Sequence, residues 1–188
     1  LSMYQIHTLK FSNTSGNLNC VDTVDIILRT CDREFRGTQR WTGNKHQTVI
    51  GCLTSVIESA LVAHNKDHTN LNMTWLDDQS SDEMVKTITC LLRDHWPGQV
   101  NRLTTDQTGN GATYGICVDY AKNHCRNLIY FLEDDYIHLP ITLQEMVESW
   151  YKLSADLNQD VVLYPVDYVD RYIPNFFYHG LGHTSSIY

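Results

Sequence analysis

Three adjacent carboxylates, Glu133, Asp134 and Asp135, end an apolar run of the sequence that begins at Tyr130. Acidic side chains repel one another and are costly to bury, so at the end of a core strand they require a cation or a hydrogen-bonding ligand. Oxygen ligands suit Mg²⁺ and Mn²⁺, which usually retain waters and substrate oxygens. We therefore expect Asp135, with Glu133 or Asp134, to hold Mn²⁺ or Mg²⁺ against a diphosphate. The alternative is a solvated turn, or a cap for the helix expected after Pro140.

Two further polar segments follow apolar runs, one at residues 30–33 and one at residues 77–82. A carboxylate such as Asp78 can accept the imide N–H of uracil or thymine, whereas cytosine and adenine have no donor at the matching position. Asp78 is thus a candidate for reading the base of a nucleotide. The alternative is that Asp77 and Asp78 only close a turn and cap the helix that we expect from Ser80.

Predicted strands and helices alternate along the chain. The expected strands cover residues 23–30, 71–76, 100–103, 127–132 and 160–165, and the expected helices cover 47–63, 80–96, the stretch through 116–121 and a segment after Pro140. Ser80 with Glu83, and Thr142 with Glu145, have the spacing of capping boxes. The alternation predicts an α/β fold, with a mostly parallel, Rossmann-like sheet and helices on both faces. The acidic segments then share the crevice at the carboxyl ends of the strands.

The composition indicates one globular domain of 188 residues, with 42% hydrophobic residues and a net charge of -8. This acidic balance argues against a nucleic-acid partner, which clustered Lys and Arg would bind. We expect no transmembrane segment, since no run approaches the roughly 20 apolar residues that one needs. A signal peptide is also not apparent. Six cysteines without a C-x-x-C pair favour reduced thiols and a cytoplasmic location.

The segments 27–33, 76–82 and 131–135, in this order and at these separations, resemble the donor-binding half of the GT-A glycosyltransferases, especially family two. The resemblance covers about residues 23–165. It implies a single GT-A catalytic domain over residues 1–188, with a donor-binding part at about 23–135. The acceptor-side part, at about 136–188, is short for the family, as in a truncated domain.

The resemblance also implies roles for particular residues. Thr30 and Asp32 would line the nucleoside pocket, and Asp78 would contact the base. The acidic triplet would be the metal and ribose-diphosphate motif, with Asp135 as the leading metal ligand. Its pattern is Glu-Asp-Asp in place of the usual Asp-x-Asp, so the sequence leaves open which two carboxylates face the ion.

The donor phosphates often meet a basic residue before the acidic strand in this family, and here that region has no Arg or Lys. It contains Gly109, Asn110 and Gly111, whose backbone N–H groups could approach the ligand. Arg33 or Arg102 could instead supply the charge. The alternative for the glycines is an ordinary loop and helix cap.

On the acceptor side, Asp167 and Asp170 are the candidates for a general base toward an acceptor hydroxyl. A structural salt bridge, such as Asp170 with Arg171, is the alternative for either acid. Aromatic residues at 176–178 could stack on sugar faces. His179 or His183 could complete a metal shell, or lie on the surface.

Together these features predict a metal-dependent glycosyltransferase that moves a sugar from a nucleoside diphosphate donor to a glycan or other hydroxyl acceptor. UDP-sugars are the expected donors. Two alternatives remain: a nucleotidyltransferase, which normally needs a basic glycine-rich loop near its first strand, and a catalytically silent nucleotide-sugar or glycan-binding module.

Overall fold

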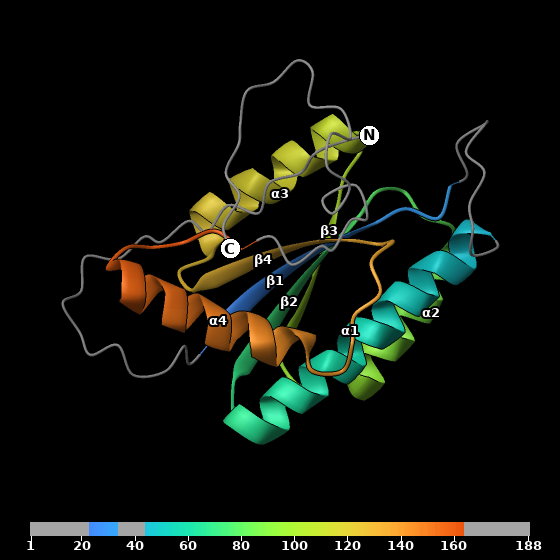
Figure 1. The fold of residues 1–188 in the computed structure, drawn as a ribbon. Coiled ribbons are helices and arrows are strands. Elements are labelled where there is room, and N and C mark those ends of the chain that lie inside the picture. The colour runs from blue at the N-terminus through green and yellow to red at the C-terminus, as the bar shows by residue number, and fades with distance from the viewer. Residues whose placement is uncertain (1–22, 34–43, 164–188) are drawn as a thin grey trace, which may run out of the picture.

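The computed structural model describes residues 23–33 and 44–163 (Figure 1). Four strands and four helices alternate in this part of the chain. They are β1 (Thr23–Thr30), α1 (Lys45–Asp67), β2 (Asn70–Asp77), α2 (Asp82–His95), β3 (Val100–Thr104), α3 (Asn110–His124), β4 (Leu128–Glu133) and α4 (Thr142–Leu157).

The four strands form one sheet in the order β3-β2-β1-β4, and every neighbouring pair is parallel. β1 lies between β2 and β4, with Thr30 opposite Asp77 and Arg29 opposite Glu133. The predicted parallel α/β fold is therefore confirmed. Because all strands run the same way, the polar segments that follow β1, β2 and β4 lie at the same edge of the sheet.

Helices cover both faces of the sheet (Figure 1). Ile26 and Leu28 point to the face on which α1, α2 and α4 pack, while Ile27 between them points to the face covered by α3. This alternation follows from the two-residue period of a strand. β1 is apolar on both faces because it is buried on both, which is typical of a central parallel strand.

Three details of the predicted elements are wrong. Ser81, not Ser80, is the N-cap of α2, and its hydroxyl accepts from the Met84 amide at 3.2 Å. α4 begins without a side-chain cap, so the expected capping box of Thr142 with Glu145 does not form. The predicted strand at residues 160–165 is not formed at 160–163, and its last two residues lie outside the described residues.

α1 is 23 residues long and, by length and composition alone, is long and apolar enough to cross a membrane, which we did not expect. Half of its apolar window is buried in the structure. Residues such as Leu53, Val56 and Ala60 pack in the core against the sheet. This packing accounts for the apolar composition, as in the core helix of a globular domain.

Five of the six cysteines lie in the described part of the chain, and none of these five forms a disulfide. Burial raises the pKa of the Cys52 thiol to about 12 and that of Cys117 to about 11. These thiols therefore stay protonated at neutral pH and behave as small apolar side chains. The cytoplasmic location stays a prediction, as does the division of the whole chain into donor and acceptor parts.

Candidate functional site

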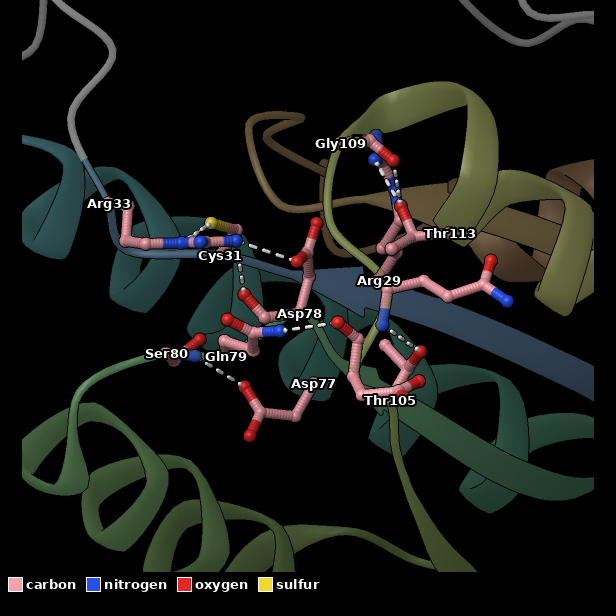
Figure 2. Close-up of polar contacts among 12 residues, drawn as sticks. Arg29, Cys31, Arg33, Asp77, Asp78, Gln79, Ser80, Thr105, Gly109 and Thr113 are labelled. Carbon is pink, nitrogen blue, oxygen red and sulfur yellow. Dashed lines mark hydrogen bonds and ion pairs between the residues drawn. The ribbon is translucent and has the colours of Figure 1, made fainter.

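The first acid of the triplet, Glu133, is the last residue of β4 and is paired with Arg29 of β1. Arg29 also donates to the Thr113 hydroxyl of α3 at 3.0 Å (Figure 2). Burial raises the pKa of Glu133, and the neighbouring Arg29 partly offsets this. Glu133 therefore joins β4 to β1, and its carboxylate has a cationic partner within the protein.

The second acid, Asp134, is buried and also has protein partners. One oxygen is paired with the ammonium of Lys45, the first residue of α1, and the other accepts from the Cys31 amide at 2.7 Å. The Lys45 side chain is only 5% exposed. Burial raises the pKa of Asp134, while Lys45 and the Cys31 amide favour its ionised form. Through Lys45 and the Cys31 amide, Asp134 connects the start of α1 and the end of β1 to the acidic triplet.

The third acid, Asp135, is exposed and makes no hydrogen bond or ion pair with the described residues. No group of three metal-ligating side chains occurs within residues 23–33 and 44–163. One free carboxylate fits the way Mg²⁺ and Mn²⁺ bind in such sites, since these ions are often held by one or two carboxylates plus substrate phosphates. The geometry therefore favours Asp135 over Glu133 and Asp134 as the metal ligand.

The loop after the triplet is anchored on α1. The Ser55 hydroxyl accepts from the His138 amide at 3.0 Å, and the Ser59 hydroxyl accepts from the Leu143 amide at 2.9 Å. The Cys52 thiol donates to the Glu133 carbonyl at 3.3 Å. α1 thus fixes both the acids and the loop that leads away from them.

Thr30, at the end of β1, is buried. Its hydroxyl accepts from the Trp75 indole N–H at 2.6 Å, and its carbonyl accepts from the Asp78 amide at 2.9 Å. These bonds join the ends of β1 and β2. The amide of the next residue, Cys31, donates to the Asp134 carboxylate. The predicted nucleotide segments at 30–33 and 77–82 are therefore both connected to the acidic triplet at this edge.

Asp78, the predicted base reader, is buried and is paired with Arg33. Nη2 of Arg33 donates to Oδ1 of Asp78 at 2.7 Å and to its carbonyl at 3.0 Å, as Figure 2 shows. Nε of the same side chain lies 3.4 Å from the Cys31 sulfur. Asp32 turns to the start of α2, where its carboxylate accepts from the Ser81 amide at 2.9 Å and from the Ser81 hydroxyl.

Asp77 closes the turn before α2, as the alternative interpretation of this segment anticipated. Its oxygens accept from the Ser80 amide at 3.0 Å and from Arg102 at 2.8 Å. The Arg102 guanidinium also lies 5.0 Å from the centre of the Trp75 ring, in a cation–π arrangement. Of the two arginines proposed for the phosphates, Arg102 is thus held by β2, and Arg33 by Asp78.

Asn110 is the first residue of α3, and the structure describes its backbone only. Gly109 before it has a positive φ of 92°, which glycine adopts without strain because it has no Cβ. The Gly109 carbonyl accepts from the Thr113 amide and hydroxyl. Thr113 therefore links Gly109, at the start of α3, to Arg29 (Figure 2). Arg29 in turn is paired with Glu133, so the predicted phosphate-binding loop is connected to the acidic triplet.

Asp167 and Asp170, the candidate general bases, lie outside the described residues, as do His179 and His183. Their roles stay predictions. The residues that the sequence analysis missed are Arg29, Lys45 and His138. Arg29 and Lys45 are cations whose acidic partners lie 104 and 89 residues away in the sequence. A charged residue inside the apolar β1 run was the one signal available for Arg29, because a charge there needs a partner.

His138 lies in the anchored loop, and Nε2 of its ring lies 2.8 Å from the Tyr130 hydroxyl. Burial lowers the pKa of His138 to about 4, from an ordinary value of 6.5. An unfolded chain therefore binds a proton at this site more readily than the folded one, and stability is lost as the pH falls through the range from 6.5 toward 4.

Because the unfolded chain takes up a proton at His138, we expect the free energy of unfolding of the wild type to fall by about 2 kcal/mol between pH 7 and pH 5. His138→Gln removes the titrating group and should reduce that loss, which urea unfolding at the two pH values would measure. Exchange of the exposed His95 for Gln is the matched control. Equal pH dependence in the wild type and His138→Gln would contradict the assignment.

A parallel sheet with polar segments from β1, β2 and β4 at one edge defines an open α/β protein, a class in which ligands bind at the carboxyl ends of the strands. The model of the family "Glycosyl transferase family 2" matches residues 42–184 of the chain. Because the match covers more than half of the chain, the protein belongs to this family. The matched stretch begins after β1, so the segment at 27–33 lies outside it.

Among solved structures, the chain is similar to TarS of S. aureus. A crystal structure of TarS has 15% sequence identity and a TM-score of 0.44, over 71% of this chain and 20% of TarS. TarS 1-349 has 16% identity and a TM-score of 0.44, and its complex with UDP has 16% and 0.42. These two comparisons cover 71% of this chain and 32% and 33% of TarS 1-349. The chain therefore spans a fifth to a third of these structures. The curated proteins include no significant match.

Proposed function

We propose that the chain binds a nucleoside diphosphate sugar together with Mn²⁺ or Mg²⁺ and transfers the sugar to an acceptor hydroxyl. Family membership supports the glycosyltransferase class. The observation that carries the proposal is the difference among the three acids. Glu133 and Asp134 have cationic partners, whereas Asp135 is exposed at the edge of the sheet where residues 30–33 and 77–82 meet. A UDP-sugar is the donor that a base-reading Asp78 would select.

The residues have distinct tasks in this proposal. Asp78 would accept the imide N–H of the base, and the N–H groups at the start of α3 would bind the phosphates. Asp135 would hold the metal, which when bound offsets the charge of the departing diphosphate. Arg29 and Lys45 keep the two inner acids in place, so that Asp135 is presented outward. Asp167 or Asp170 would take the proton of the acceptor hydroxyl.

The test is hydrolysis or transfer with a panel of UDP-sugars, measured as released UDP, with Mn²⁺, with Mg²⁺ and with a chelator. We expect release from at least one donor that stops when the metal is chelated. Metal-dependent UDP binding without release from any donor, even with glycan acceptors present, would instead identify a silent binding module. A nucleotidyltransferase would release diphosphate from a nucleoside triphosphate, and the family match argues against it.

A further inference from the structure

The two carboxylate oxygens of Asp78 differ in their contacts. Nη2 of Arg33 donates to Oδ1 at 2.7 Å and to the Asp78 carbonyl at 3.0 Å. Oδ2 accepts no hydrogen bond from the described residues and is not fully buried. Figure 2 shows the Arg33 guanidinium on one side of the carboxylate, paired with one of its oxygens only. The carboxylate therefore offers a single free acceptor to a ligand.

This orientation of the carboxylate is held by several contacts. The Asp78 side chain is only 3% exposed, and the Asp78 amide donates to the Thr30 carbonyl at 2.9 Å. A rotation that presented both oxygens to a ligand would break the charge-assisted hydrogen bond with Arg33. The Arg33 side chain is 41% exposed, and its Nη1 has no partner among the described residues, so it can donate to a ligand while Nη2 stays on Asp78.

Uracil and guanine differ at the edge that such a carboxylate would meet. Each has a ring N–H donor, N3–H in uracil and N1–H in guanine. In uracil this donor lies between two carbonyls, whereas in guanine it lies between a carbonyl and a 2-amino group, which is a second donor. A carboxylate with two free oxygens can accept from both guanine donors at once. A carboxylate with one free oxygen makes a single hydrogen bond with either base.

We propose that Arg33 is a specificity-determining residue that makes the site select uracil over guanine. The inference rests on the proposed function, in which Asp78 accepts a hydrogen bond from the base of a nucleoside diphosphate sugar. Because Arg33 occupies Oδ1, the 2-amino group of guanine has no acceptor on Asp78, and an unpaired polar group disfavours binding. Uracil needs only Oδ2, and the carbonyl beside its N–H can accept from the guanidinium.

Removal of the guanidinium should therefore have opposite effects on the two bases. Arg33→Met frees Oδ1, so the guanine of GDP gains a second hydrogen bond with Asp78. The uracil of UDP gains none and loses the guanidinium donor beside its carbonyl. A residue that only held Asp78 in position would weaken both ligands. IDP isolates the second hydrogen bond, because its base has the N1–H and the carbonyl of guanine without the 2-amino group.

The experiment is calorimetric titration of UDP, GDP and IDP, at a fixed Mn²⁺ concentration, into the wild-type chain and Arg33→Met. We expect the wild type to bind UDP about tenfold more tightly than GDP, and to bind GDP and IDP with similar affinity. Arg33→Met should bind UDP about tenfold more weakly and GDP about tenfold more tightly, with no gain for IDP. Arg33→Lys can still pair with Oδ1 and should retain the preference for UDP.

Arg93→Met is the matched control, because Arg93 is exposed at the end of α2 and pairs with its neighbour Asp94. It should leave all three affinities unchanged, and circular dichroism verifies that each variant is folded.

Two measurements can overturn the inference. One is a wild-type chain that binds GDP as tightly as UDP, or GDP more tightly than IDP, which requires no variant. The other is an Arg33→Met variant in which all three ligands weaken equally or none changes. A wild-type chain that binds none of the three diphosphates would instead refute the proposed function.

Discussion

Asp135→Asn is expected to abolish the dependence of UDP binding on Mn²⁺ and to leave the fold intact. The substitution keeps the shape of the side chain and removes its charge. Asp135 is exposed and makes no hydrogen bond or ion pair with the described residues, so the fold does not depend on its charge. Since a metal contributes several kcal/mol to the stabilisation of a leaving group, turnover should fall by about a hundredfold or more.

Calorimetry with UDP, in the presence and absence of Mn²⁺, measures the effect on binding, and thermal unfolding verifies the fold. Asp156→Asn is the matched control, because Asp156 is an exposed acid near the end of α4. It should retain the metal dependence of the wild type. If Asp135→Asn retains it too, Asp135 is not the metal ligand, and another acid must hold the ion.

Lys45→Met is expected to destabilise the protein by about 3 to 5 kcal/mol, the usual cost of removing one partner from a buried ion pair. The loss arises because Asp134, which is 8% exposed, would lose the cation that compensates for the burial of its carboxylate. The Cys31 amide would then be its one described hydrogen-bond partner. Urea unfolding at constant pH measures the change in free energy.

The double variant Lys45→Met with Asp134→Asn separates the charge from the packing. Asparagine needs no cation, so the double variant should recover a large part of the lost stability. Lys66→Met, at the exposed end of the same helix, should change the free energy by less than about 0.5 kcal/mol. A loss of less than about 1 kcal/mol in Lys45→Met would show that the pair does not hold the site together.

The sheet could be predicted from the sequence because its strands are short apolar runs bounded by polar residues. β1 was predicted at 23–30 and is observed at Thr23–Thr30. α1 was predicted at 47–63 and is observed at Lys45–Asp67, so it is longer at both ends. Its N-terminal cap is Asn44, whose side chain accepts from the Gln47 amide, and its last turn is polar. An apolar periodicity carries no information about such polar ends, so the boundaries were missed.

For the site, the sequence predicted the meeting of the three acidic segments, because parallel strands place their carboxyl ends at one edge. It did not predict how the acids are used. The pairing of Asp134 with Lys45, and of Glu133 with Arg29, depends on tertiary packing between residues far apart in the chain. The pattern Glu-Asp-Asp alone could not indicate which carboxylates are neutralised and which one is exposed.

The most direct test of the central claim, that these acids form a metal-assisted nucleotide-sugar site, is the titration of UDP into the wild-type chain with Mn²⁺ and again with a chelator. We expect saturable binding with Mn²⁺, and affinity lower by about tenfold or more in the chelator. Binding that is equally tight without the metal, or no binding under either condition, would contradict the account.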